Sequence, residues 1–279
     1  MSKIMKIGII GLGLIGGSIA LKLKEVNNKI VIYGFDQNTD SLDYSLKNNI
    51  IDKRFNPDSL IGFDYIFLAI PVESIKKQLK IILDKISKET LVIDLGSTKY
   101  QICNSVKTHN NRGNFLASHP IAGTEFSGPI AARKDLFNNK VMILCETENT
   151  NSSLLLSAIE IFKKLGMNIK TMGSLEHDKH IAYVSHLSHI SSFMLGKTVM
   201  DKEDDDQTIY DMAGSGFEST VRLAKSSPEM WSSIFIENKK NIIESLDEYI
   251  LNINNFKKLI ESGDQENLNT EMKKINGIR

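Results

Sequence analysis

Hydrophobic and polar positions follow two different patterns along this chain, and the change falls near Gly173. Before it, short apolar runs rich in β-branched residues alternate with stretches of helical periodicity, such as Ser74–Ile86 and Ser153–Leu165. Strands that are apolar throughout and alternate with helices are typical of a parallel sheet covered on both faces. The predicted strands are Ile4–Ile10, Ile30–Phe35, Tyr65–Ile70, Leu91–Leu95, Phe115–Ser118, Val141–Cys145 and Asn168–Met172.

After Gly173 the pattern is helical and predicts no strand. One helix is expected from Ser174 to about Val199, where the charged run Lys202–Asp206 would end it. Pro228 stands where a first-turn proline belongs, and it opens a long amphipathic helix to about Ile260. The second half of the chain therefore predicts an all-helical domain.

Composition and charge narrow the class of protein. Hydrophobic residues make up 41% and charged residues 24% of the chain, which are ordinary values for a globular protein. The 34 basic and 34 acidic residues balance, so no nucleic-acid partner is indicated, because such proteins usually carry a basic surplus. The run Ile4–Ile10 is too short to span a membrane, and Cys103 and Cys145 lack metal-ligand spacing and read as reduced core residues. We expect a soluble, cytoplasmic protein.

A glycine-rich loop joins the first predicted strand to the first predicted helix. Gly11 permits a tight turn, Gly13 lets the backbone approach a pyrophosphate, and Gly16 lets the helix pack closely on the sheet. The helix N-terminus would then present free N–H groups to the phosphates. The full loop reads Gly11-Leu12-Gly13-Leu14-Ile15-Gly16 and predicts a dinucleotide site.

Two further segments extend this predicted site. Asp36 follows the second strand, about 20 residues beyond the last glycine of the loop, where an acid binds the ribose hydroxyls and repels a 2′-phosphate. NAD is therefore favoured over NADP, and Asp36 as a simple turn residue is the alternative. Ala69 and Pro71 end another strand and are expected on the nicotinamide side of the cofactor, unless the proline only terminates the strand.

These patterns together define a fold class. We predict an α/β protein with an N-terminal Rossmann-type parallel-sheet domain at 1–172 and an all-helical C-terminal domain at 173–279. The apolar faces of the helices must be buried, so we expect the helical domain to form a homodimer.

Chemistry-bearing residues cluster at the expected ends of two later strands. Ser97 follows Asp94, Leu95 and Gly96 and offers a hydroxyl to the cleft, although it could serve only as a helix N-cap. His119 stands between a strand and Pro120, and an imidazole there suits proton exchange with a substrate hydroxyl.

The helical half adds imidazoles and an arginine. Four histidines fall between His177 and His189, but at about 100° per residue they cannot converge on one metal ion, so no metal site is predicted. The pair His186 and His189 is expected on one polar face, turned either to a cleft or to a dimer interface. Arg222 follows a glycine-rich turn and is suited to bidentate capture of a carboxylate, with a plain surface arginine as the alternative.

In order along the chain, these segments resemble the prephenate and arogenate dehydrogenase family. The runs His-Pro-Ile-Ala-Gly-Thr-Glu and Ser-His-Leu-Ser-His are far more specific than the glycine motif. The matching segments are Gly11–Ser18, Asp94–Lys99, His119–Glu125, Ser185–His189 and Gly214–Arg222. The resemblance implies NAD-dependent oxidative decarboxylation of prephenate to 4-hydroxyphenylpyruvate in tyrosine biosynthesis, with the active site between the two domains.

The same resemblance implies individual roles. His119 would accept the proton of the ring hydroxyl as hydride leaves for the nicotinamide, and Ser97 would orient that imidazole. Arg222 would hold a substrate carboxylate. The remaining substrate-lining residues would be His186, His189, Thr124 and Glu125.

Some alternatives stay open. Ser188 stands where relatives often carry a proline, and Glu218 stands where they often carry a basic residue. An acid at Glu218 could weaken binding of a dianionic substrate or favour one with an ammonium group, so arogenate is the rival substrate. A β-hydroxyacid dehydrogenase also has a Rossmann domain followed by helices, but its lysine motif is not found here. A non-catalytic NAD-binding sensor is a third interpretation.

Overall fold

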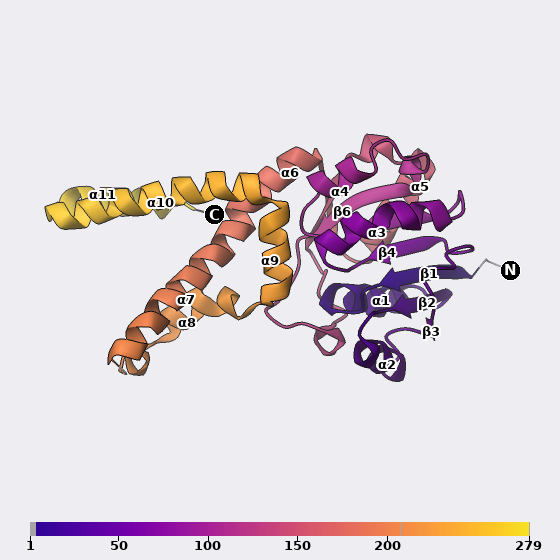
Figure 1. The fold of residues 1–279 in the computed structure, drawn as a ribbon, viewed down its shortest axis with the longest axis horizontal. Coiled ribbons are helices and arrows are strands. Elements are labelled where there is room, and N and C mark those ends of the chain that lie inside the picture. The colour runs from indigo at the N-terminus through magenta and orange to yellow at the C-terminus, as the bar shows by residue number, and fades with distance from the viewer. Residues whose placement is uncertain (1–3, 207, 279) are drawn as a thin grey trace.

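A computed structural model of the chain describes residues 4–206 and 208–278. It has two parts, a sheet covered by helices and a group of helices that extends away from it (Figure 1). The last strand of the sheet ends at Met172, and the first helix of the second part begins at Ser174. The change of pattern near Gly173 therefore coincides with a change of architecture.

The strands agree closely with the predicted apolar runs, except for one short edge strand, β3, that has no apolar signal. The strands are β1 (Met5–Ile10), β2 (Ile30–Phe35), β3 (Lys53–Arg54), β4 (Tyr65–Leu68), β5 (Leu91–Asp94), β6 (Phe115–Pro120), β7 (Val141–Cys145) and β8 (Asn168–Met172). The α-helices between them are α1 (Leu14–Val26), α2 (Thr39–Lys47), α3 (Val72–Lys85), α4 (Tyr100–Ser105) and α5 (Ser152–Lys164). Short 3-10 turns lie at η1 (Arg112–Asn114), η2 (Pro129–Ala131) and η3 (Thr147–Asn149).

One sheet contains all eight strands in the order β3-β2-β1-β4-β5-β6-β7-β8. Six of its pairings are parallel, as expected, but β6 and β7 pair antiparallel. Parallel neighbours need a crossover that carries the chain back along the sheet. The segment between β6 and β7 makes no such crossover: the N–H of Ile121 donates to the carbonyl of Val141 at 2.8 Å. The chain therefore turns back beside its own strand, and β7 runs the opposite way.

Both faces of the sheet are covered. Helices α1, α2 and α5 pack on one face, while α3 and α4 pack on the other. Strands β4 and β5 are buried at every position, which explains their unbroken apolar sequences. Trp231 and Ile234 of α9 join the core on the α3 face, so apolar packing attaches the helical part to the sheet.

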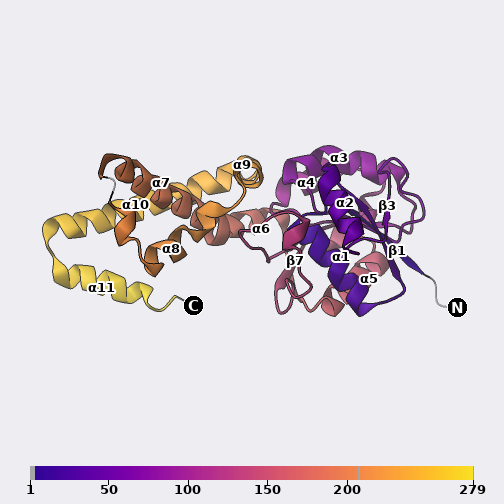
Figure 2. The same ribbon diagram turned by 90° about the horizontal axis from the view of Figure 1, so that it is seen from below.

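The helical part contains α6 (Ser174–Ile181), α7 (Leu187–Asp206), α8 (Ser215–Val221), α9 (Pro228–Glu237), α10 (Lys239–Ser262) and α11 (Gln265–Ile275). Short turns are η4 (Ala182–His186), η5 (Tyr210–Met212) and η6 (Arg222–Lys225). Helices α7 and α10 diverge as two arms, and α11 folds back along α10 (Figures 1 and 2).

Two helix predictions in this part are corrected. The helix expected through Val199 contains a π-helical turn, η4, and continues to Asp206. The single helix expected from Pro228 is two helices, α9 and α10, which meet at Asn238. Asn238 is 3% exposed, and its side-chain amide donates to the carbonyl of Asp178 at 2.6 Å. This tertiary contact stabilises the junction between α9 and α10.

Cys103 and Cys145 are free and buried, as expected from their spacing. Within residues 4–206 and 208–278, no helix combines the length and apolar character needed to cross a bilayer. The cytoplasmic location stays a prediction.

Candidate active site

Five strand ends line one edge of the sheet. Strands β2, β1, β4, β5 and β6 are neighbours and all parallel, so their carboxyl ends point the same way. Ligands in such sheets bind beyond this edge. The segments that follow or end these strands contain, in the same order, Asp36, the Gly11–Gly16 loop, Ala69, Ser97 and His119. The predicted dinucleotide site and the predicted base therefore share one edge.

The glycine loop has the geometry of a pyrophosphate cradle. Gly11 has a φ of +94°, and a Cβ there would lie 2.3 Å from the carbonyl oxygen of Ala69. A Cβ on Gly16 would lie 2.0 Å from the carbonyl oxygen of Gly11. At Gly13, by contrast, a Cβ would meet nothing within 4 Å. Packing therefore requires glycine at Gly11 and Gly16. At Gly13 the absent side chain leaves open space at the N-terminus of α1, where Leu14 and Ile15 begin the helix.

The Asp36 carboxylate is fixed beside this loop. One oxygen accepts the N–H of Leu12 at 2.7 Å, and the other accepts the N–H of Asn38 at 2.9 Å. Ala69 lies across the loop and donates its N–H to the carbonyl of Ile10 at 2.8 Å, and the exposed Pro71 precedes α3. The residues present fit a dinucleotide, with an acid held where the adenosine ribose would lie.

We expect Asp36→Asn to lower the preference for NAD over NADP. The substitution removes the charge that repels a 2′-phosphate and turns one N–H toward a backbone donor. One lost charge-assisted hydrogen bond corresponds to a change of about tenfold in the ratio of kcat/KM for the two cofactors. Steady-state rates with each cofactor measure this ratio. Asp40→Asn removes the same charge four residues later and should leave it unchanged; an equal effect in both variants would mean that only general charge matters.

His119 has a partner that the sequence did not indicate. Its Nδ1 lies 2.9 Å from Nε2 of His177, which is 58 residues away on α6, and the two rings meet edge to face. Burial, with the nearby His177 and Lys99, holds the pKa of His119 well below its usual range. The imidazole is therefore neutral at pH 7 and able to accept a proton. Ser97 is half-buried after β5, and no described hydrogen bond joins it to His119.

A buried ion pair lies directly behind these strand ends. Lys99 is 0% exposed; its ammonium group bonds the carboxylate of Asp94 and donates to the carbonyl of Ser118 at 2.7 Å. Asp94 also accepts the N–H of Gly96 at 2.6 Å. Burial raises the pKa of Asp94, and Lys99 opposes that rise. The pair ties the end of β5 to the end of β6, and so fixes the strand that holds His119.

The other two predicted imidazoles occupy different environments. His186 is 1% exposed and packs against Asn238 and Trp231, and burial lowers its pKa to about 4. His189 is half-buried and stacks on the same tryptophan, with ring centroids 3.5 Å apart. Its Nδ1–H donates to the carbonyl of Ser185 at 3.0 Å. The structure therefore leaves His189 closer to the surface and places His186 beneath it.

The predicted substrate-binding arginine is paired with a predicted lining residue. Arg222, which is 52% exposed, donates to a carboxylate oxygen of Glu125 at 3.1 Å across 97 residues of sequence. The pKa of Glu125 lies below its usual range, because the backbone N–H of Glu125 and, to a smaller extent, Arg222 stabilise its carboxylate. The hydroxyl of Thr124, one residue earlier, accepts the N–H of Phe126 at 3.3 Å. The loop after β6 and the end of α8 therefore meet at this pair.

Among residues 4–206 and 208–278, no three His, Cys, Asp or Glu side chains are grouped so as to hold a metal ion. The site residues missed from sequence are His177, Asp178, Asn238 and Trp231. Only His177 carried a signal, as one of the clustered histidines. Its partner could not be identified because their contact spans two parts of the fold.

Two family models match the chain. The model for the nucleotide-binding domain of prephenate dehydrogenase matches residues 19–171, and the model for its dimerization domain matches residues 173–274. A prephenate dehydrogenase of Bacillus subtilis is 33% identical over 264 residues, which cover 92% of this chain and 71% of that protein.

Solved structures give the same result. The structure of Aquifex aeolicus prephenate dehydrogenase in complex with hydroxyphenyl propionate and NAD+ is 30% identical with a TM-score of 0.88, over 98% of this chain and 96% of that one. Arogenate dehydrogenase of Synechocystis is 27% identical with a TM-score of 0.79, over 98% of each chain.

Proposed function

Because this chain belongs to the prephenate dehydrogenase family, we propose that it converts prephenate to 4-hydroxyphenylpyruvate and CO2 with NAD as the oxidant. The observation that carries the proposal is the shared sheet edge, which holds a dinucleotide loop and a neutral imidazole. The sequence also left two other interpretations open, a β-hydroxyacid dehydrogenase and a non-catalytic NAD-binding sensor, and family membership disfavours both.

The reaction turns a cyclohexadiene alcohol into a phenol. The ring carbon loses a hydride, its hydroxyl loses a proton, and the ring carboxylate leaves as CO2 with its bonding electrons entering the ring. NAD, when bound, supplies the acceptor for the hydride. Nε2 of His119 receives the hydroxyl proton and returns one to the phenol oxygen, so no net proton is released. Aromatisation provides the driving force, and the protein contributes positioning and this one proton acceptor.

Arg222 is the proposed anchor of a substrate carboxylate. Its guanidinium is half-exposed and already holds one carboxylate, that of Glu125. A substrate carboxylate that binds here must share the guanidinium of Arg222 with Glu125 or displace Glu125 from it. The existing ion pair shows that this guanidinium accommodates a carboxylate. His189 and Thr124 lie in the adjoining segments and complete the proposed lining, while Ser97 adds a hydroxyl between cofactor and ring.

Arogenate is the rival substrate, since Glu218, which is exposed on α8, could attract an ammonium group. The deciding experiment compares NADH or NADPH formation with prephenate and arogenate, each with NAD and NADP. We expect the combination of prephenate and NAD to have the highest kcat/KM. A higher value with arogenate would reassign the substrate, and absence of turnover with both would reject the proposed function.

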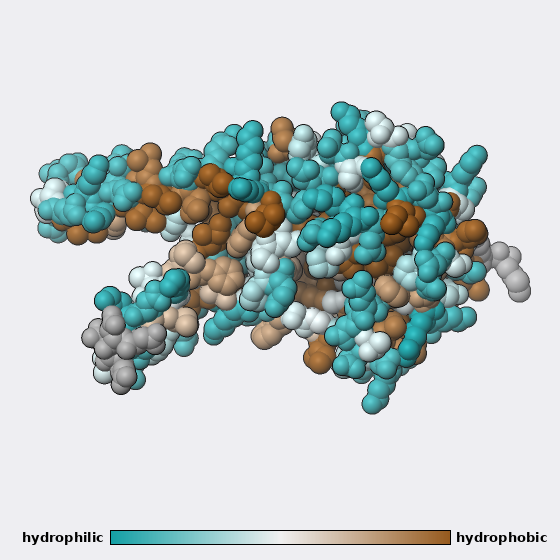
Figure 3. All heavy atoms as spheres, in the orientation of Figure 1, coloured by the Kyte–Doolittle hydropathy of each residue, from teal (hydrophilic) through white to brown (hydrophobic). Residues whose placement is uncertain are grey.

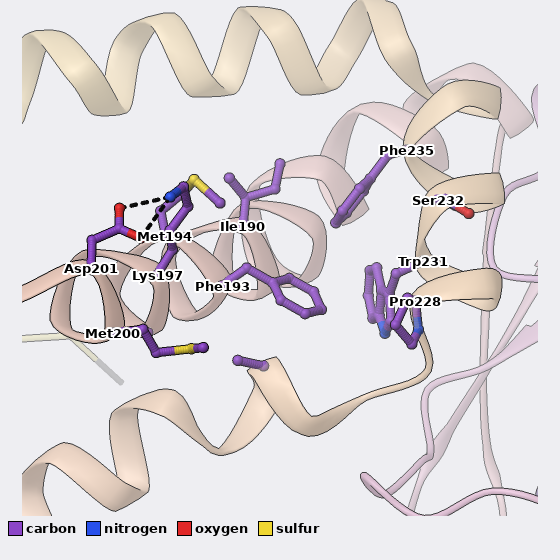
Figure 4. A pocket seen from close by; sticks show the side chains of 12 residues that line it. Ile190, Phe193, Met194, Lys197, Met200, Asp201, Pro228, Trp231, Ser232 and Phe235 are labelled. Atoms are coloured by element: carbon purple, nitrogen blue, oxygen red, sulfur yellow. Dashed lines mark hydrogen bonds and ion pairs between the residues drawn. The ribbon is translucent and has the colours of Figure 1, made fainter. Parts of the chain in front are cut away.

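We also propose that the protein is a homodimer through residues 173–279. An open groove of about 760 Å³ lies between α7, η6 and α9 and is lined mainly by apolar side chains, among them Phe193, Met194 and Trp231 (Figure 4). Apolar surface also follows the arm formed by α10 (Figure 3). Its exposed isoleucines recur at heptad-like spacing, at Ile243, Ile250, Ile253 and Ile260. The dimerization-domain match makes a second copy the proposed occupant.

Ile250→Asp should shift the protein from dimer to monomer. In a two-fold interface each substitution counts twice, so losing two buried isoleucines raises the dissociation constant by at least about 100-fold. Light scattering after size exclusion gives the mass. Ile81→Asp is the matched control, because Ile81 is similarly exposed but lies on α3 of the sheet part. A dimer that persists in Ile250→Asp would remove α10 from the interface.

A further inference from the structure

We propose that His177 and Asp178 are positioning residues that hold His119 in its Nδ1–H tautomer, so that Nε2 faces the substrate as an unprotonated acceptor. The inference rests on the proposed function and concerns the same site. Both residues belong to α6 of the helical part, whereas His119 belongs to the sheet.

Asp178 is the fixed end of this chain of hydrogen bonds. It is 2% exposed, and its carboxylate accepts the backbone N–H groups of Lys99 at 2.7 Å and Tyr100 at 2.9 Å. The third group on it is Nδ1 of His177, at 2.8 Å. Because a carboxylate offers only acceptors, Nδ1 of His177 must carry a proton. This contact therefore sets the tautomer of His177.

The tautomer of His177 in turn sets that of His119. Burial lowers the pKa of His177 despite the nearby carboxylate, so its ring is neutral and its Nε2 has no proton. Nε2 lies 2.9 Å from Nδ1 of His119, and two bare nitrogens cannot form a hydrogen bond. The proton between the rings therefore belongs to Nδ1 of His119, which leaves its Nε2 free to accept.

The surrounding charges favour this arrangement. Lys99 and His186 also act on His119, and both disfavour its protonation. The ammonium group of Lys99 is neutralised by Asp94. These groups therefore keep the ring of His119 neutral, which the tautomer argument requires. Because Asp178 binds the start of α4, this alignment also requires α6 to be docked on the sheet part.

Two substitutions of His177 separate this role from a purely structural one. His177→Gln places an amide oxygen near the position of Nε2 and can still accept the proton of His119. His177→Asn places its amide near the position of Nδ1, so it can bond Asp178 but leaves His119 without a partner. We expect kcat to fall about 100-fold to 1,000-fold in His177→Asn but less than about tenfold in His177→Gln, by comparison with loss of the aspartate in a serine-protease triad.

The KM values for prephenate and NAD should change less than about threefold in both variants, because neither role places His177 against a ligand. His180→Asn, on the exposed side of the same helix, is the matched control and should behave like the wild type. The reverse order, with His177→Asn active and His177→Gln inactive, would show that the residue only anchors α6 and would overturn the proposal.

A measurement on the free protein keeps this inference separate from the proposed function. In wild-type protein with ¹⁵N-labelled histidine, the ring nitrogens of His119, assigned by loss of signal in His119→Asn, should show one Nδ1–H tautomer. His177→Asn should convert it to a mixture or to Nε2–H. An Nε2–H tautomer in the wild type would overturn the inference whether or not the protein oxidises prephenate, whereas inactivity with both substrates would count against the proposed function alone.

Discussion

Replacing His119 with asparagine is expected to lower kcat by about 1,000-fold while NAD affinity stays within about twofold of the wild type. A positioned general base contributes about 10²-fold to 10⁴-fold to a rate, and the amide of asparagine cannot accept the hydroxyl proton. NAD affinity should survive because the Gly11–Gly16 loop and Asp36 belong to other strand ends. Rapid-mixing measurement of NADH formation gives the rate, and fluorescence titration gives the affinity.

The pH profile supplies the control. The base must be unprotonated, so kcat/KM should fall only as the pH drops through the pKa of His119, which burial places well below 6.5. That acid limb should be absent from the residual activity of His119→Asn. Turnover within tenfold of the wild type, or an unchanged acid limb, would remove His119 from its assigned role.

Replacing Lys99 with methionine is expected to lower the free energy of unfolding by about 3–5 kcal/mol. The substitution leaves the carboxylate of Asp94 buried without its cation, and breaking a buried pair from one side is costly in this way. The carbonyl of Ser118 also loses its donor. Urea unfolding followed by circular dichroism measures the change.

Two variants test whether the loss comes from an uncompensated charge. The double variant Lys99→Met, Asp94→Leu removes both charges and should recover most of the lost stability. Lys77→Met breaks the exposed pair with Glu73 on α3 and should leave stability nearly unchanged. If the double variant is no more stable than Lys99→Met, the loss of stability comes from lost packing and not from the uncompensated charge of Asp94.

Much of the cofactor half of the site could be predicted from sequence. The strand ends at Asp36, Gly11 and His119 follow from short apolar runs, and the tight turn predicted from the glycine at position 11 has a backbone φ of +94°. These features depend on steric and hydrogen-bonding rules that act over a few residues. Once the strands are parallel, their carboxyl ends must share an edge. The meeting of loop and imidazole was therefore predictable before any packing was known.

The helical half was less predictable because its signals are periodic and its geometry is not. Assigning about 100° to every residue assumes an unbroken α-helix. The π-helical turn Ala182–His186 interrupts the predicted helix just before His189, and His186 and His189 both contact Trp231, although His186 is buried and His189 only half-buried. The break at Asn238 is likewise absent from the periodic pattern, because it coincides with a hydrogen bond from the buried amide of Asn238 to the carbonyl of Asp178 on another helix.

The amino-acid sequence alone determined the class of fold, the dinucleotide loop and the residue that serves as the proposed base, since each depends on neighbours in the chain. Tertiary structure decided what that base touches. His119 and His177 are 58 residues apart, and Glu125 and Arg222 are 97 apart. Such contacts exist only after the helices dock on the sheet, because apolar burial selects the docking and side-chain hydrogen bonds then form between whatever it brings together.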